Sequence, residues 1–127
     1  MVEDLEINLE DNSELKDECV GNIVKGIPTH NHLKRLHLGF EYCELSSKSG
    51  VSFGKLFGKL NRIEDLEVYL PDNEEFKDEG VKNTVQGITI HNHLKRLHLG
   101  LVNCNLSSKS GVSIGKLFGK LTKVEDL

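Results

Sequence analysis

HNHLKRLHLG occupies residues 30–39 of this chain and, letter for letter, residues 91–100. The second copy begins 61 positions after the first, and the same spacing separates Glu3-Asp4-Leu5 from Glu64-Asp65-Leu66. The triplet returns once more at 125–127. A sequence that matches itself at a fixed period is typical of repeat architectures, so this period indicates the fold class before any single residue does.

Each long unit divides once more, into segments that are alternately 31 and 30 residues long. The segments begin at Val2, Leu33, Ile63, Leu94 and Val124. Each of the first four opens with apolar residues at alternate positions, which is the pattern of a half-buried strand. The expected strands cover 5–9, 36–40, 66–70 and 97–101, and three positions after each comes Asn12, Cys43, Asn73 or Cys104.

A helical pattern follows the strands. Apolar residues at the spacing i, i+3, i+4, i+7 predict a helix through Val20, Ile23, Val24 and Ile27, and another through Phe53, Leu56, Phe57 and Leu60. One strand with one helix is too small to bury its own apolar face. Stacked neighbours would share a continuous core, which is how solenoids are stabilised.

A strand, an Asn or Cys turn and a helix, repeated about every 30 residues, resemble leucine-rich repeats of the ribonuclease-inhibitor-like subgroup, although these repeats are longer than usual. The resemblance covers essentially the whole chain. It implies an α/β fold: a right-handed solenoid, part of a horseshoe, with a curved parallel sheet on the concave face and helices on the convex face. The chain is then one domain, 1–127, with repeats at about 2–32, 33–62, 63–93 and 94–123 and a fifth starting at 124–127.

Composition excludes several classes of partner. The net charge is −4, without the basic field that nucleic-acid phosphates require. No apolar run approaches the roughly 20 residues that span a bilayer, so we expect no membrane partner. The acidic N-terminus, MVEDLEINLEDN, is no signal peptide, which favours a cytoplasmic location.

The glycines of SKSGVSFGKLFGKL, residues 47–60, suggest a phosphate-binding loop at first sight. That motif needs four residues between its glycines, and Lys followed by Ser or Thr. Gly50 and Gly54 enclose three residues, and Leu56 follows Lys55. We expect instead a helical glycine stripe that a neighbouring backbone approaches closely, with Gly111, Gly115 and Gly119 behaving likewise.

The other reactive side chains, cysteine and histidine, do not form the pattern of a catalytic site. Cys43 and Cys104 occupy the turn position, where a buried structural role is expected. Every histidine has a twin in the other copy, unlike the single set of convergent groups that an active site needs. The His-x-His pairs, His30 with His32 and His91 with His93, lack a third metal ligand. We expect no enzyme, no metal and no cofactor.

Strand alternation predicts which side chains face the concave side. Neighbouring strands should place them in columns in which acidic and basic residues alternate. Tyr69 should be the one aromatic residue on this face, and its ring should lie over Gly39 or Gly100 or serve as the anchor for a partner. The predicted protein-binding residues are Asp4, Glu6, Asn8, Arg35, His37, Asp65, Glu67, Tyr69, Arg96 and His98. Asp126 would extend the first column.

The expected function is non-catalytic binding of another protein through the concave face. The alternative is a structural repeat segment or spacer of a larger multidomain protein. Neither end shows the polar capping repeat typical of solenoids, so the chain is expected to be an excerpt, and end-to-end self-association is a further expectation.

Overall fold

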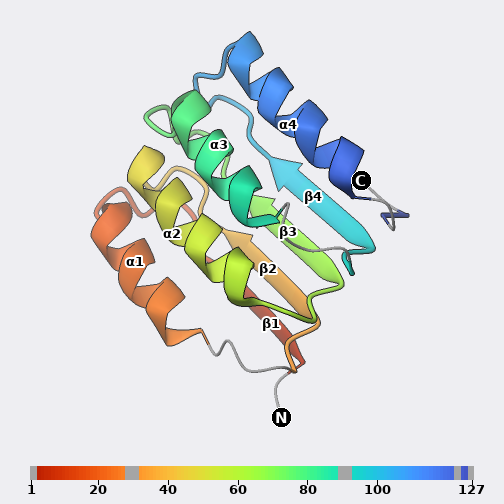
Figure 1. Ribbon diagram of the computed structural model, residues 1–127. Helices are drawn as coiled ribbons and strands as arrows, with labels where there is room; N and C mark the ends of the chain where they lie inside the picture. Colours follow the sequence, from red (N-terminus) through yellow and green to blue (C-terminus); the bar gives the residue numbers. More distant parts are fainter. Residues whose placement is uncertain (1–2, 28–31, 89–92, 122–123, 126–127) are drawn as a thin grey trace.

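Strand and helix alternate along the computed structural model, which describes residues 3–27, 32–88, 93–121 and 124–125 (Figure 1). The strands are β1 (Asp4–Asn8), β2 (Arg35–Gly39), β3 (Asp65–Tyr69) and β4 (Arg96–Gly100). The helices are α1 (Lys16–Gly26), α2 (Ser47–Lys59), α3 (Lys77–Ile88) and α4 (Ser108–Lys120). The predicted order of one strand and one helix per segment is confirmed, with each strand beginning one residue earlier than expected.

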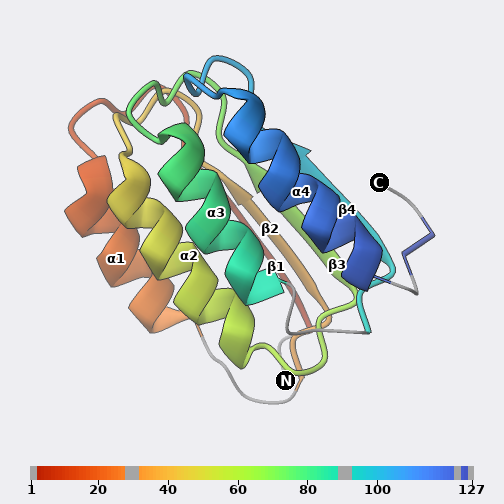
Figure 2. The same ribbon diagram turned by 45° about the horizontal axis from the view of Figure 1, so that its top comes forward.

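The strands form one parallel sheet in the order β1-β2-β3-β4. Leu5, Leu36, Leu66 and Leu97 pair in one row across it, so equivalent positions of successive segments lie side by side. The helices pack on one face of this sheet (Figure 2). The opposite face is called the open face below. The chain therefore has an α/β fold with a parallel sheet, as predicted.

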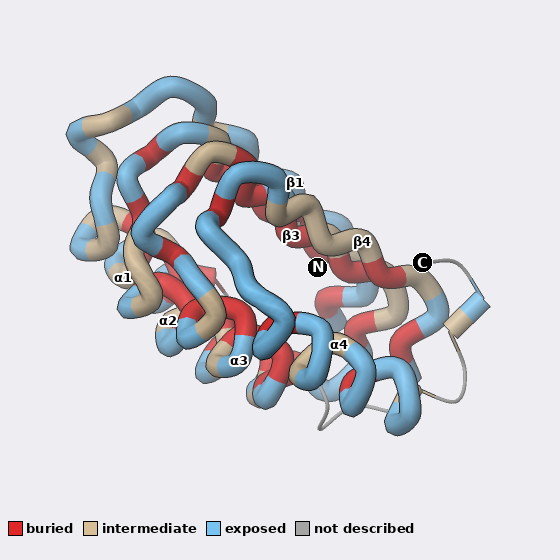
Figure 3. The backbone as a smooth tube through the Cα atoms, turned by 90° about the horizontal axis from the view of Figure 1, so that it is seen from above, coloured by how far each residue is buried: buried red, intermediate tan, exposed pale blue. Residues whose placement is uncertain are grey.

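The core lies between the helices and the sheet, where buried segments of both layers face each other (Figure 3). Its centre is aromatic: the rings of Phe40 and Phe53 lie 6.0 Å apart, and those of Phe53 and Phe57 lie 6.1 Å apart. All three side chains are at most 1% exposed. The helix predicted from Phe53 and Phe57 thus buries the face that its periodicity indicates.

Asn73 serves the backbone where the strands end. Its Oδ1 accepts hydrogen bonds from the N–H groups of Cys43 and Leu45, at 3.1 and 3.0 Å. Its Nδ2 donates to the carbonyls of Phe40 and Leu70, at 2.7 and 3.0 Å. One buried side chain therefore satisfies four backbone groups that neither sheet nor helix could pair.

The two turn cysteines act in the same way. The Sγ of Cys43 donates to the carbonyl of Leu9 at 3.2 Å, and that of Cys104 to the carbonyl of Leu70 at 3.0 Å. Burial raises the pKa of both thiols. Their predicted structural role is confirmed, and the raised pKa disfavours the thiolate that nucleophilic chemistry would need.

Each odd-numbered helix also carries an aspartate that holds the N-cap serine of the next helix, an arrangement called an inter-helix cap below. The carboxylate of Asp17 on α1 accepts hydrogen bonds from the backbone N–H of Ser46 and from the hydroxyls of Ser46 and Ser49, at the start of α2. Asp78 does the same for Ser107 and Ser110 at the start of α4. Sequence reasoning missed this link, although Lys-Asp-Glu and Ser-Ser-Lys-Ser both recur at the repeat spacing.

These hydrogen bonds alter both carboxyl groups. Burial alone would raise the pKa of Asp17, but hydrogen bonds from Ser46 and Ser49 outweigh it and lower the pKa below its usual value. Hydrogen bonds from Ser107 and Ser110 lower the pKa of Asp78 to about 2. Both caps are therefore ionised at neutral pH.

The glycine stripe of α2 lies against α3. A Cβ built on Gly50 would lie 2.5 Å from the carbonyl oxygen of Gly80, and one on Gly54 would collide with the carbonyl of Asn83. The predicted close approach of a neighbouring backbone is confirmed for these two glycines. The expectation that the second stripe behaves likewise is wrong: Gly111, Gly115 and Gly119 would each accept a Cβ with nothing within 4 Å, because α4 is the last helix of the described row.

Candidate functional site: the open face

The predicted open-face residues lie in the predicted register. One column pairs Asp4, Arg35, Asp65 and Arg96 across the sheet, the next pairs Glu6, His37, Glu67 and His98, and the third pairs Asn8, Gly39, Tyr69 and Gly100. Each charged column therefore alternates an acidic with a basic residue type, Asp with Arg in the first and Glu with His in the second, at a spacing of about 4.8 Å. Asp126 lies outside the described residues.

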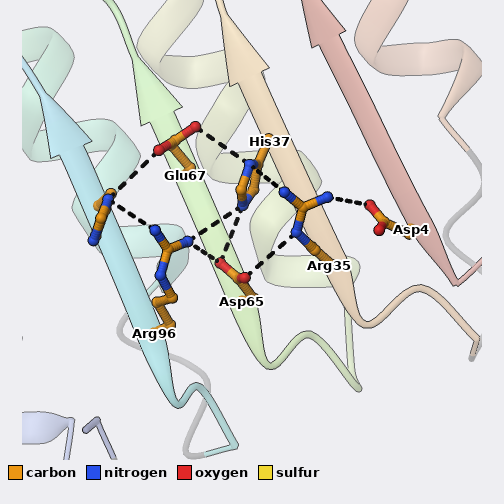
Figure 4. Close-up of polar contacts among 7 residues, drawn as sticks. Asp4, Arg35, His37, Asp65, Glu67 and Arg96 are labelled. Carbon is orange, nitrogen blue, oxygen red and sulfur yellow. Dashed lines mark hydrogen bonds and ion pairs between the residues drawn. The ribbon is translucent and has the colours of Figure 1, made fainter. Parts of the chain in front are cut away.

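Asp65 is the centre of the charged network (Figure 4). Its Oδ1 accepts a hydrogen bond from Arg96 Nη1 at 2.9 Å and lies 3.2 Å from His37 Nε2. Its Oδ2 lies 3.5 Å from Arg35 Nε. Burial alone would raise the pKa of Asp65, but the hydrogen bonds from His37 and Arg96 outweigh it and lower the pKa. The carboxylate therefore stays ionised and joins β2 to β4 across β3.

His37 differs from its prediction. As a predicted binding residue, placed between Glu6 and Glu67 in its column, it was expected to be accessible, but it is only 6% exposed. Its ring nitrogens lie 3.2 Å from Asp65 Oδ1 and 3.3 Å from Glu67 Oε2, and within the described chain it makes no ion pair with Glu6. The physical reason is that the ring can leave water while both nitrogens keep polar partners. The order of the columns and the pairing with Glu67 are confirmed, whereas Asp65 takes the place predicted for Glu6.

The network extends to both outer strands. Arg35 Nη1 donates to Asp4 Oδ1 at 2.6 Å, and Glu67 Oε1 lies 3.5 Å from His98 Nδ1. Exposed cross-strand pairs of opposite charge contribute roughly 0.2–1 kcal/mol each. Their larger effect is to hold long side chains in one arrangement across the whole open face.

Tyr69 lies at the end of β3 with 47% of its surface exposed. Its ring covers Gly100: a Cβ there would lie 3.0 Å from Tyr69 Cε1 and would collide with Cδ1. Gly39, on the other side, is covered by Asn8, whose Oδ1 would lie 2.8 Å from an added Cβ. Of the two predicted contacts, the structure therefore has the one with Gly100. Tyr69 shields backbone with one face of its ring, and almost half of the residue remains accessible.

A shallow hollow lies beside the tyrosine ring. Its polar lining comes from the second and third columns, with Glu6, Asn8, His37, Gly39, Glu67 and Tyr69 around it. Glu6 is exposed and, among the described residues, has no ion-pair partner. The hollow thus combines an aromatic wall, a buried glycine that Asn8 covers, and an accessible carboxylate.

The other predicted candidates lie away from this face. His32 and His93 are exposed, while His30 and His91 fall outside the described residues. Across residues 3–27, 32–88, 93–121 and 124–125, no three His, Cys, Asp or Glu side chains are grouped to hold a metal ion. None of the described helices is long and apolar enough to cross a membrane.

Comparison with known proteins gives no match, either to a protein-family model or to a curated protein. The arrangement of side chains on the open face is therefore the basis for the function proposed next.

Proposed function

We propose that this protein is a leucine-rich-repeat solenoid of the ribonuclease-inhibitor-like kind, and that its open face, concave in such a solenoid, binds another protein without catalysis. Two features support the fold: the parallel strands alternate with helices in one row, and Asn73 and the two turn cysteines bond the backbone at matching positions. A cytoplasmic location is part of the same proposal.

The observation that carries the binding role is Tyr69. It is a large exposed ring on a face whose other long side chains are largely held by one another. Tyrosine is enriched among the residues that dominate binding energy, because it offers wide contact area with few rotatable bonds. A surface that is already ordered also loses less conformational freedom when a partner binds.

The hollow beside Tyr69 indicates the chemistry of the partner. Glu6 and Glu67 lie on its rim, and Glu6 carries an exposed carboxylate without an ion pair in the described chain. A lysine or arginine of the partner would neutralise this carboxylate while its aliphatic stem packs on the tyrosine ring. We therefore propose a protein partner that presents a basic side chain next to an apolar one.

Site-specific photo-crosslinking tests this role. A photoreactive phenylalanine analogue at position 69 should trap the partner, and the same analogue at position 55, on α2, should not. For the trapped protein, Tyr69→Ala and Glu6→Gln should each weaken capture, while Lys55→Ala leaves capture unchanged. Equal losses from Tyr69→Ala and Lys55→Ala, with the fold intact, would place the binding site away from the sheet.

The second candidate is a structural spacer within a larger protein. One observation favours it: Asp65 and His37 bond to each other and to Arg96 and Glu67. Many charged groups of the open face are therefore already paired within the chain. A spacer needs no surface anchor. It predicts that position 69 traps no more protein than position 55.

A further inference from the structure

The helices are of two kinds that alternate along the row. α2 and α4 differ at one position, and α1 matches α3 at seven of its eleven positions. The contact between α2 and α3 is the closest kind: a Cβ on Gly54 or on Gly87 would collide with the backbone of the opposite helix. This contact is the template for how a helix like α2 or α4 packs against a helix like α1 or α3.

The outer face of α4 matches the face that α2 turns to α3. Residues 107–121 repeat residues 46–60 with one difference, Ile114 in place of Phe53. Phe57 is 1% exposed, whereas its counterpart Phe118 is 48% exposed. Gly115, the counterpart of Gly54, has nothing within 4 Å of an added Cβ. α4 thus presents an apolar, glycine-lined face with no described element against it.

The outer face of α1 matches the face that α3 turns to α2. Gly26 corresponds to Gly87, and an added Cβ on Gly26 would again meet nothing within 4 Å. Asn12 corresponds to the fully buried Asn73 but is exposed, and within the described residues its Nδ2 donates to the nearby carbonyl of Glu10 alone. The first segment therefore carries the α3-like half of the same contact, and α4 carries the α2-like half.

Cys19 is one of the residues of α1 that differ from the template, as are Ile23 and Lys25. Cys19 stands where α3 has Gly80. A Cβ on Gly80 would lie 2.8 Å from the ring of Phe76, but the first segment has the smaller Leu15 at that place. The smaller neighbour leaves room for the cysteine side chain, which is partly exposed.

We infer that the two end faces recognise each other, so that a second copy of this chain docks head to tail, with its α1 and β1 against α4 and β4 of the first copy. The contact repeats the one between α2–β2 and α3–β3. It differs from the open-face role proposed above because Tyr69 takes no part in it. Glu6, on β1, lines the hollow and also lies on the docking strand, so Tyr69→Ala is the substitution that separates the two roles and should leave self-association unchanged.

The charges on the edge strands also favour docking of a second copy. Docked in the register of β2 with β3, β4 would place Arg96 opposite Asp4 of the next copy and His98 opposite Glu6. These are the pairs that β2 already makes with Asp65 and Glu67. Asn12 of the next copy would accept from the N–H groups of Cys104 and Leu106, as Asn73 does from Cys43 and Leu45.

The C-terminal segment competes for part of this edge. The N–H of Glu125 donates to the carbonyl of Lys95 at 2.7 Å, which repeats the 2.8 Å bond from Glu64 to Lys34. Glu125-Asp126-Leu127 has the same sequence as Glu3-Asp4-Leu5. A second copy would replace this segment with an equivalent one, so removal of residues 122–127 should strengthen docking.

One pair opposes docking. Lys55 and Gln86 border the depression between α2 and α3, and their counterparts are Lys116 and Lys25. Two ammonium groups would approach each other in the docked pair. Such repulsion between exposed charges is weakened by salt, with a screening length of about 8 Å at 0.15 M. Lys25→Gln restores the template and should strengthen self-association.

Sedimentation of the full chain over a range of concentrations tests the inference. A head-to-tail contact is heterologous, so the mass should keep rising with concentration rather than stop at a dimer. Gly115→Ala should weaken association at least about tenfold because the new Cβ would strike the incoming backbone. The same substitution replaces an exposed helical glycine, so it should raise the melting temperature of the dilute monomer.

Gly21→Ala is the matched control. Its Cβ would lie 3.9 Å from Ser52 Oγ, an ordinary contact on the side of α1 that faces α2, so association should not change. Alkylation of Cys19 gives a second readout, because docking covers this thiol in the wild type but not in Gly115→Ala.

Mixing two blocked variants gives the decisive result. Gly115→Ala keeps a working α1 face, and Gly26→Ala keeps a working α4 face. Each alone should be monomeric, and a mixture should form a one-to-one dimer and stop there. A wild type that stays monomeric up to about 1 mM overturns the inference, because its dissociation constant for self-association would then exceed about 1 mM. Undiminished assembly of Gly115→Ala, or a mixture without a dimer, also overturns it.

Discussion

α2 and α4 differ at one position within the stretch from cap to cap, yet their surroundings differ greatly. α2 lies between α1 and α3 and buries Phe57, while α4 has α3 on one side and leaves Phe118 about half exposed. Both form a helix of 13 residues with the same serine cap. Local sequence therefore suffices for the helix and its start, whereas the neighbouring segment determines which side chains become core.

The largest expected effect comes from the two phenylalanines. Phe57→Ala should lower the free energy of unfolding by about 3–5 kcal/mol, because it removes a fully buried ring and leaves a cavity. Phe118→Ala should lower it by less than about 1 kcal/mol, because the ring is half exposed in the single chain. Urea denaturation of dilute protein measures both. Equal losses would mean that α4 is covered in solution even at low concentration.

The two asparagines form the second pair. Asn73→Ala should cost about 1–3 kcal/mol, because it leaves the buried N–H groups of Cys43 and Leu45 without an acceptor. Asn12→Ala should stay within about 0.5 kcal/mol, since its side chain is exposed. The amide protons of Cys43 and Leu45 should lose protection from hydrogen exchange only in the Asn73 variant. Unchanged protection there would contradict the role assigned to this side chain.

Acid should weaken both inter-helix caps. The folded pKa values of Asp17, Asp65 and Asp78 lie below the usual value, and that of Asp78 is about 2. A lowered folded pKa means that the ionised form stabilises the fold, so the contribution is complete above about pH 4 and is lost as pH falls through the folded values. The free energy of unfolding should therefore decline between about pH 4 and pH 2.

A double variant separates the caps from the open face. Asp17→Asn with Asp78→Asn should reduce this decline and leave the part that belongs to Asp65. NMR titration of Asp78 in a Ser107→Ala, Ser110→Ala background should show its pKa returning towards the usual value. A decline that is unchanged in the double variant would rule out the caps as its source.

The smallest effect concerns backbone conformation in the turns. Glu44 and its counterpart Asn105 both adopt a left-handed conformation, with φ of 56° in each. Asparagine tolerates this region better than glutamate, so Glu44→Asn should stabilise the fold by a few tenths of a kcal/mol, up to about 1. Glu74→Asn, in an exposed turn position without positive φ, is the matched control. Equal shifts in melting temperature would assign the gain to charge instead of conformation.

The repeat spacing predicted the strands, the helices and the register well. Arg35 lies opposite Asp4 and Asp65 because strands of equal length recur at a fixed spacing. The roles of Asn73 and Cys43 were predictable for the same reason. The caps by Asp17 and Asp78 were missed, because they join residues of different segments that no local pattern connects, although both partners recur at the repeat spacing.

The open face shows where sequence reasoning ends. Alternation placed Tyr69 there, and its contact with Gly100 rather than Gly39 depended on the direction in which the ring leans. His37 was placed in the right column, but its burial depended on where the side chains of Arg35, on the same strand, and Arg96, on β4, lie against its ring. Such choices depend on side-chain rotamers and desolvation, and residue spacing contains neither.

The sequence by itself therefore determined the order of strands and helices, the parallel register and the charge columns, since a period of two along each strand and a fixed repeat length leave one consistent alignment. Tertiary structure alone decided that Asp65 joins three strands, that His37 is buried, and that Phe57 is core while Phe118 is surface. The physical reason is that burial is a property of contacts between segments. Two identical side chains have the same propensity, but only the one with a neighbour on both sides is removed from water.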